Sequence, residues 1–529
     1  MATDAGDARP GGVHSRAWFP AALVAAGGLA FGLFAMNALP VGVFHDDARY
    51  LVLARSIVQG TGFRVTNLPG APAGTHFPPG FPLLLAALWR LAPAFPANVV
   101  LFKLLNAALL AGAALATYSY ARLRGGLSAP VSAAVALTFA GTVPVLFLDG
   151  LLFSEPLFTA AMLLSLLLAE RAAGRATPRR DASGDLLAFT SGLAGGGVAM
   201  IRSIGVAVVI GLCVTLLLRR RWRAALAALA GACIFVVPWQ LWTLRHAQEI
   251  PQIMAAHYGT YGRWVAPMLQ RDGYMALAHV AAINLRGLGI ILTLFGVGSA
   301  APLFGILVAA TLLLLLALGL ARSARTSLVS VIAVAAYAGA MMIWPWEPDR
   351  YFWPLWPLVL TAMACGAVQL LAWKPTQTLR RSMRVALLSA SGACAVLFVG
   401  WHLTAYRSRS WEEPARRNAR LAVAVAELAT RLPAGLIACD FDALVVLYTG
   451  RAAVPIRATK AEDYLRPLTA DDAAAELLVL LDSYHPRFLL ITSEEIRMAA
   501  QMLSTGSAAR LSFDGVSPGG VVIYVPTVR

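Results

Sequence analysis

Long uninterrupted apolar runs constrain this chain more than any other feature of its sequence. Runs of roughly 17–25 apolar residues follow one another from residue 18 to residue 404, and an α-helix needs about that length to cross a bilayer. Only 13% of the 529 residues are charged, whereas about a quarter are charged in a soluble domain. The sequence therefore predicts a polytopic α-helical membrane protein.

The apolar runs predict about eleven transmembrane helices. An additional apolar stretch near 287–300 has the length of a re-entrant segment or a half-span. The expected spans are 18–41, 98–121, 129–148, 152–170, 186–201, 203–218, 224–243, 302–321, 328–345, 351–373 and 385–404.

Arginine and lysine clusters predict the orientation of these helices, because such clusters mark cytoplasmic loops. The clusters fall on alternate loops, at 122–124, 171–180, 219–223, 322–325 and 374–384. The N-terminus is then cytoplasmic, and the loops 42–97 and 244–286 and the tail from about 405 are extracytoplasmic. The net charge of +16 is explained by this topology signal and does not indicate nucleic-acid binding.

The tail, 405–529, differs in composition from the membrane part, 1–404. Short β-rich runs alternate with helical patterns, which predicts a small extracytoplasmic α/β domain. The tail contains no glycine-rich phosphate loop and no metal-ligand cluster. We expect it to have a structural or acceptor-docking role.

Two adjacent carboxylates open the first loop, in the segment "FHDDARYLVLARSIVQG". Either Asp46 or Asp47 is well placed to cap a helix from about Ala48 to Gln59, with Gly60 ending it. Such a helix has an apolar side and would lie along the membrane surface. Local signals alone do not distinguish capping from chemistry.

Other charged residues are expected at the same outer face. Glu155 begins the fourth span, Arg202 is a lone cation between apolar segments, and Arg350 lies in "WPWEPDRYFWPLWPLVL". Ionisable residues next to lipid are costly and tend to face a cavity or a partner. The tryptophans of this last segment and the aromatic residues of "AAHYGTYGRWV" are equally compatible with membrane anchoring and with sugar stacking.

Five segments, taken together and in this order, resemble the GT-C glycosyltransferases of the bacterial protein O-mannosyltransferase-like and aminoarabinose-transferase-like group. The resemblance covers about residues 20–375, with Asp47 where the family often has Glu and Arg49 where it often has an aromatic residue. The segments are "DDARYLVLARSIVQGTGF", "THFPPGFPLLLAAL", "FSEPLF", "LAGGGVAMIRSIGV" and "DRYFWPLWPLVL".

The resemblance implies transfer of a sugar from a polyprenyl-phosphate carrier to a lipid, glycan or protein acceptor, usually with inversion, outside the bacterial inner membrane. By match to the family, Asp46 is the general base, and Asp47 assists, orients or binds a metal. Glu155 positions the acceptor or stabilises the transition state. The implied substrate-binding residues are Arg350 and Arg202 for the carrier phosphate, with His76, Tyr351 and Tyr50 as further candidates.

Two questions stay open at this point. The acidic and histidine residues lack clear metal-ligand spacing, so a divalent cation is left open and no metal ligand is assigned. The alternative function is a transporter or flippase, for which inverted repeats and ionisable residues at mid-span are expected. The sequence shows neither, which favours the enzyme.

Overall fold

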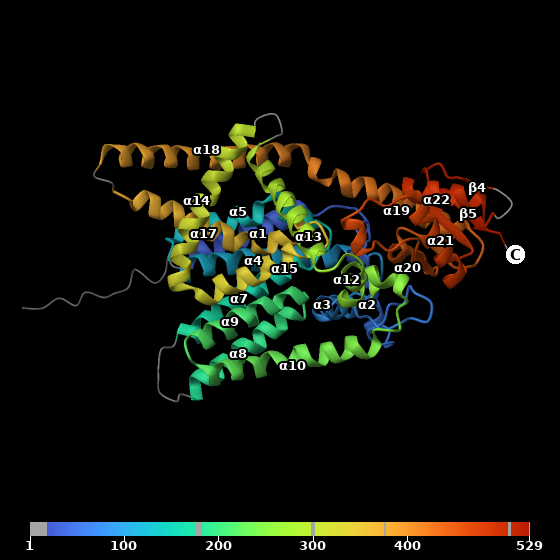
Figure 1. Cartoon of the computed structure of the whole chain (residues 1–529), viewed down its shortest axis with the longest axis horizontal. Coiled ribbons are helices and arrows are strands. Elements are labelled where there is room, and N and C mark those ends of the chain that lie inside the picture. The colour runs from blue at the N-terminus through green and yellow to red at the C-terminus, as the bar shows by residue number, and fades with distance from the viewer. Residues whose placement is uncertain (1–17, 175–181, 298–301, 375–376, 506–508, 528–529) are drawn as a thin grey trace, which may run out of the picture.

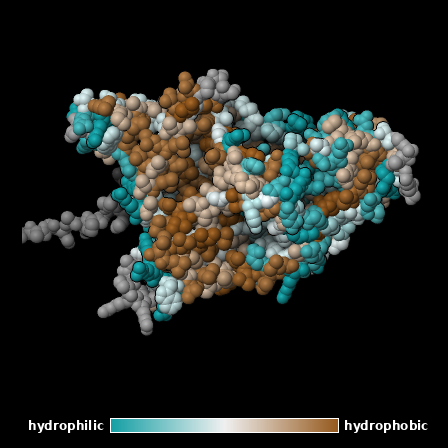
Figure 2. Space-filling view, viewed as in Figure 1, coloured by the Kyte–Doolittle hydropathy of each residue, from teal (hydrophilic) through white to brown (hydrophobic). Residues whose placement is uncertain are grey.

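The computed structural model describes residues 18–174, 182–297, 302–374, 377–505 and 509–527. A bundle of long helices adjoins a smaller C-terminal α/β region. Helices α2 (Asp46–Val58), α3 (Gly80–Leu91) and α12 (Tyr261–Asp272) lie next to their junction (Figure 1). Apolar residues dominate the visible surface of the bundle, whereas hydrophilic residues dominate that of the C-terminal region (Figure 2). This distribution is typical of a multi-pass membrane protein with an extramembrane part.

By length and composition, seven helical segments among the described residues can cross a membrane, or eight if a pair bent by 54° forms one span. The bent pair is α5 (Ala129–Gly141) and α6 (Val143–Gly150). The seven segments are α4 (Val99–Leu123), α7 (Glu155–Gly174), α10 (Trp222–His246), α13 (Met275–Gly287) with η4 (Leu288–Phe295), α14 (Pro302–Thr326), α16 (Asp349–Phe352) with η5 (Trp353–Leu355) and α17 (Trp356–Ala372), and α18 (Thr378–Ser408).

Shorter helices complete the bundle. They are α1 (Phe19–Ala35), α3 (Gly80–Leu91), α8 (Ala182–Ala199), η2 (Ser203–Gly205) with α9 (Val206–Leu218), and α15 (Leu328–Met342). The polytopic helical architecture expected from the apolar runs is thus present, and the count of eleven spans stays a prediction.

The segment after α10 differs from its expected form. The loop expected at 244–286 contains η3 (Gln252–Met254), α11 (Ala255–Tyr258) and α12 (Tyr261–Asp272), but α13 begins at Met275. Asn284 and Arg286 interrupt the apolar run here, and the membrane boundary of this loop stays a prediction. The buried Asn284 amide donates to the carbonyls of Met341, Met342 and Trp344, so the fold satisfies this polar group internally.

Close contacts between helix backbones hold parts of the bundle together. At Gly192 of α8, a Cβ atom would lie 1.8 Å from the carbonyl oxygen of Ala228 in α10. The same relation joins Gly319 of α14 to Ala362 of α17, also at 1.8 Å. Small residues at such positions let membrane helices approach closely and gain packing energy.

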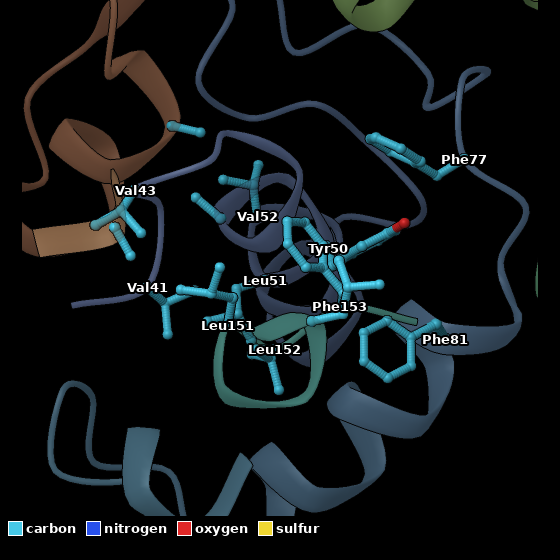
Figure 3. Close-up of a cluster of buried hydrophobic side chains, with 14 of the residues drawn as sticks. Val41, Val43, Tyr50, Leu51, Val52, Phe77, Phe81, Leu151, Leu152 and Phe153 are labelled. Atoms are coloured by element: carbon cyan, nitrogen blue, oxygen red, sulfur yellow. The ribbon is translucent and has the colours of Figure 1, made fainter. Parts of the chain in front are cut away.

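The helix after the paired acids is α2 (Asp46–Val58), and it does not lie on a surface. Its residues Tyr50, Leu51 and Val52 are buried among apolar side chains of the first loop and of the turn before α7 (Figure 3). It packs against α3 and against α20 (Asp442–Thr449) of the C-terminal region. The expectation of an interfacial helix was wrong, because these elements cover its polar side as well.

The capping prediction for Asp46 and Asp47 was also wrong. The helix begins at Asp46, its N-cap residue is His45, and no side chain caps it. Both carboxylates are bonded to other groups, which are described below. Their charge in the first turn still favours the positive end of the helix dipole.

The C-terminal region contains a five-stranded sheet in the order β2-β1-β3-β5-β4. Strands β2, β1 and β3 are parallel, and β5 runs antiparallel to β3 and β4. The expected alternation of helices and strands is present, and β4 is an addition to it. The elements are α19 (Glu413–Arg431), β1 (Ile437–Cys439), α20, β2 (Ala453–Pro455), η7 (Ala461–Tyr464), α21 (Ala470–Tyr484), β3 (Phe488–Ile491), α22 (Glu494–Ser504), β4 (Leu511–Val516) and β5 (Val522–Pro526), after η6 (Ser410–Glu412).

Candidate active site

A cavity of about 720 Å³ lies between α2, the turn before η2, α12 and α16, with Thr459 of the C-terminal region in its lining. Its volume is within the range of small-molecule sites. Six of the eight residues predicted from the sequence line it, whereas Asp47 and Glu155 do not. The six are Asp46, Tyr50, His76, Arg202, Arg350 and Tyr351.

Four of the predicted residues form a continuous chain of ion pairs. Arg350 Nη1 lies 2.6 Å from Asp46 Oδ2, and Arg350 Nε lies 2.5 Å from Glu155 Oε1. Arg202 Nη1 also lies 2.5 Å from Glu155 Oε1. The fold thus joins α2, α7, the turn before η2 and α16, which are far apart in the sequence.

Glu155 lies behind the two arginines. Its side chain is only 4% exposed, and a buried carboxylate is costly unless it is paired. The guanidinium of Arg350 lies 4.0 Å from the centroid of the Phe153 ring, and that of Arg202 lies 5.3 Å from that of Tyr351. Glu155 and these rings together hold both guanidinium groups against the cavity.

A third guanidinium group stands beside Asp46. Arg49 Nη1 lies 3.5 Å from Asp46 Oδ1, one turn along α2, and its side chain is 6% exposed. Three guanidinium groups therefore share two carboxylates in this chain of ion pairs. Guanidinium groups held at the cavity in this way are suited to an anionic ligand such as a phosphate.

The Asp46 carboxylate is held in its ionised form. Burial alone would raise its pKa, but Arg350 and Arg49 outweigh burial and keep the pKa below its usual range. An ionised carboxylate facing the cavity can accept a proton once its partners release it.

Asp47 faces away from the cavity and is fully buried. Its Oδ2 accepts a hydrogen bond of 2.6 Å from the backbone N–H of Gly42. Burial raises its pKa to about 6, against the opposing effect of backbone hydrogen bonds from Gly42 and Ala48. No group of three or more His, Cys, Asp or Glu side chains in the described residues could hold a metal ion.

His76 forms part of the cavity wall as a neutral ring. Burial lowers its pKa to about 4. Its Nδ1 lies 2.9 Å from the carbonyl oxygen of Gly259, so Nδ1 carries the proton and Nε2 is the unprotonated nitrogen. The Tyr50 hydroxyl lies deeper, 3.3 Å from Ser154 Oγ.

The sequence did not single out three groups of lining residues. Arg49 could have been predicted as a site residue, because it lies three positions after Asp46 and therefore on the same face of the helix. His257 and Trp344 lie in aromatic segments that also resemble membrane anchors. Thr459 comes from the C-terminal region, and no sequence signal places that region over the cavity.

The C-terminal region is bonded directly to the wall behind Arg49. Asp442 Oδ2 accepts hydrogen bonds from Asn67 Nδ2 at 2.7 Å and from the Tyr258 hydroxyl at 2.5 Å. The Arg49 guanidinium lies 4.9 Å from the centroid of the Tyr258 ring. The first loop, α11 and α20 thus form one buried network beside the cavity.

Fold and site together define a multi-pass membrane protein with a cavity lined by arginines and carboxylates between its helical bundle and a C-terminal α/β region. No family model and no curated protein sequence matches the chain.

Solved structures match it over nearly its whole length. ArnT from Cupriavidus metallidurans bound to undecaprenyl phosphate is 14% identical with a TM-score of 0.52, covering 96% of this chain and 98% of that chain. The apo form of the same ArnT has the same identity and TM-score and covers 97% and 98%. The oligosaccharyltransferase of Archaeoglobus fulgidus in complex with Zn and sulfate is 14% identical with a TM-score of 0.50, covering 95% and 73%. The chain therefore shares the fold of these structures.

Proposed function

We propose that this protein is a glycosyltransferase that moves a sugar from a polyprenyl-phosphate carrier to an extracytoplasmic acceptor. The observation that carries this proposal is the ion-pair chain Asp46–Arg350–Glu155–Arg202 at the cavity. It places a candidate base beside cations suited to a phosphate. The shared fold with ArnT, solved with undecaprenyl phosphate, supports this type of donor.

The proposed reaction is a single displacement at the anomeric carbon of the donor sugar. An acceptor oxygen attacks this carbon while Asp46 takes the acceptor proton. The bond from the anomeric carbon to the phosphate oxygen breaks, and the phosphate leaves with the bonding electrons. One displacement inverts the anomeric centre, and a phosphate leaving group needs no general acid, unlike the leaving group in a glycosidase.

The arginines act on the departing phosphate. Arg350 and Arg202 stabilise the charge that develops on its oxygens. Glu155 acts through them, since its Oε1 fixes both guanidinium groups. In this proposal Glu155 is a positioning residue, and Asp47 holds the start of α2 through Gly42.

We also propose the topology that the reaction requires. With eleven spans and a cytoplasmic N-terminus, residues 405–529 form an extracytoplasmic domain at the outer face of a bacterial inner membrane. The arginine clusters stay on one side only if α13 and η4 enter the membrane without crossing it. A cysteine in place of the exposed Asp482 should react with an impermeant label in intact cells. Labelling only after cell lysis would place residues 405–529 in the cytoplasm and contradict the proposed orientation.

The direct test is transfer by the purified protein in nanodiscs. Radiolabelled polyprenyl-phosphate sugars are supplied with extracted membrane acceptors, and undecaprenyl phosphate binding is measured in parallel. Arg350→Ala should lower that binding by about tenfold or more, as loss of a charge-assisted bond predicts. Arg510→Ala, at an exposed ion pair with Asp482, is the matched control. Unchanged binding by Arg350→Ala, or no transfer of any donor sugar by the wild type, would remove the proposal.

A further inference from the structure

Four aromatic residues line one part of the cavity and contact one another in series. This aromatic wall consists of Tyr261, Trp264, Trp344 and Trp346. The ring centroids of Tyr261 and Trp344 are 5.2 Å apart, those of Trp264 and Trp344 are 5.1 Å apart, and those of Trp264 and Trp346 are 6.2 Å apart. The segment between α15 and α16 supplies two of the rings, and α12 supplies the other two.

Partly buried hydrogen bonds fix the wall in place. The Asn284 amide donates to the Trp344 carbonyl at 2.8 Å and accepts from the Tyr464 hydroxyl at 2.5 Å. The Trp264 indole N–H donates to the carbonyl of Thr459 at 3.0 Å. A wall pre-organised in this way can bind a ligand at a lower ordering cost.

Ion pairs add to this fixation from the C-terminal region. Arg271 Nη1 lies 3.1 Å from Glu462 Oε2, and Arg466 Nη2 lies 2.5 Å from Asp272 Oδ1. Both pairs join the end of α12 to η7 and the residues after it. The C-terminal region thus braces the helix that carries half of the wall.

The wall begins next to the candidate base. The rings of Tyr261 and His76 are 4.7 Å apart, and His76 lines the cavity together with Asp46. Glu347 and Asp349 line the cavity near Trp346 in the chain. The Glu347 carboxylate makes no ion pair within the part of the chain that the structure describes, so it is free to accept hydrogen bonds from hydroxyl groups.

From this arrangement we infer that the aromatic wall binds a saccharide ring of the acceptor. The inference rests on the proposed function and names its acceptor class. The C–H faces of a sugar ring pack on aromatic faces, while its hydroxyl groups bond to carboxylates such as Glu347. The donor phosphate is expected at the arginines, so a ligand on the His76 side of Asp46 is the group that gives up its proton.

Membrane anchoring is the competing explanation for these rings. An anchoring tryptophan exposes its ring to lipid and its N–H to the interface. Trp264 is only 7% exposed, and its N–H is bonded inside the protein. The Trp346 side chain is 41% exposed, so its ring could contact either lipid or a bound saccharide. Trp346 is therefore the residue at which membrane anchoring and saccharide binding are best distinguished.

The test uses octyl β-glucoside, octyl β-maltoside and octanol as probes, with the full chain in nanodiscs. Calorimetry should show that both glycosides bind more tightly than octanol. Trp346→Leu, which removes the ring face but stays apolar, should weaken glycoside binding by about three- to tenfold, whereas Trp346→Phe should retain most of it. Trp222→Leu, at a 61% exposed tryptophan outside the cavity lining, is the matched control.

Transfer kinetics separate the two possible sugars. In Trp346→Leu the KM for the acceptor should rise by a similar factor, and the KM for the donor should not change. Equal binding of octanol and glycosides, unchanged glycoside binding in Trp346→Leu, or a rise in donor KM alone would overturn the inference. Failure of the proposed function would be seen in different measurements: the wild type would transfer no sugar, or the Arg350→Ala variant would bind undecaprenyl phosphate normally.

Discussion

Arg350 Nη1 lies 2.6 Å from Asp46 Oδ2, although 304 residues separate the two in the chain. The carboxylate that faces the cavity is therefore engaged by the same guanidinium that is suited to a donor phosphate. A phosphate entering the cavity competes with Asp46 for this guanidinium. We expect donor binding to release Asp46, so that the base becomes available only when the leaving group is in place.

The adjacent acids give the sharpest test of the base. Asp46→Asn should lower the transfer rate by about 10²–10⁴-fold, the usual effect of losing a general base. Undecaprenyl phosphate should still bind, because Arg350 and Arg202 remain. Asp47→Asn is the matched control, since Asp47 faces away from the cavity and an amide oxygen can still accept from Gly42. Equal loss in both variants, measured in the same assay, would contradict the assignment of Asp46.

The pH dependence of transfer should report the environment of Asp46. Only the ionised carboxylate accepts a proton, so the rate falls as the pH drops through its pKa. In the free enzyme Arg350 and Arg49 keep that pKa below its usual range against burial, so the wild-type acid limb of kcat/KM should lie below the ordinary carboxyl range. Arg49→Met removes one cation and should move the acid limb to higher pH. A pH–rate profile that coincides with the wild type would show that Arg49 does not act on the base.

The membrane part of the fold was largely predictable, because uninterrupted apolar runs allow few alternatives to helices in a bilayer. The environment of α2 was not. Its polar face predicted a surface helix, but the first loop and α20 bury Arg49 to 5% exposure. Such burial depends on contacts between distant segments, which no local pattern of residues encodes.

Most residues of the candidate site could be predicted individually from the sequence, but the contacts between them could not. Glu155, Arg202 and Arg350 each stood out because ionisable residues beside apolar runs are rare. Nothing in the sequence indicated that Glu155 would bind both arginines and lie behind them. In the C-terminal region β4 was missed, since Asp514 and Gly515 are disfavoured in strands and most of β4 is exposed.

The buried network around Asp442 should stabilise the contact between the first loop and the C-terminal region. Asp442→Ala leaves the Tyr258 hydroxyl without its acceptor and removes one of the two acceptors of the Asn67 amide, at side chains that are 3% and 1% exposed. Lost partners of this kind cost about 2–5 kcal/mol, so the apparent melting temperature should fall and protease should cut more readily near α20. Asp482→Ala, at a 62% exposed side chain, should change neither measurement. Equal melting temperatures in the two variants would show that the network is not stabilising.

Two glycines of α8, Gly192 and Gly197, allow the effect of helix packing on stability to be measured separately from that of helix propensity. A Cβ at Gly192 would lie 1.8 Å from a backbone oxygen of α10, so Gly192→Ala must push α8 and α10 apart. At Gly197 of the same helix, the nearest atom to a Cβ is in the Phe235 ring, at 4.0 Å. Replacing glycine by alanine inside a helix otherwise favours the helix by about 1 kcal/mol. Thermal unfolding in detergent should therefore show a lower melting temperature for Gly192→Ala, by overpacking of about 1–3 kcal/mol, and an unchanged or higher one for Gly197→Ala. If both variants melt at the same temperature, α8 and α10 are not in close contact at Gly192.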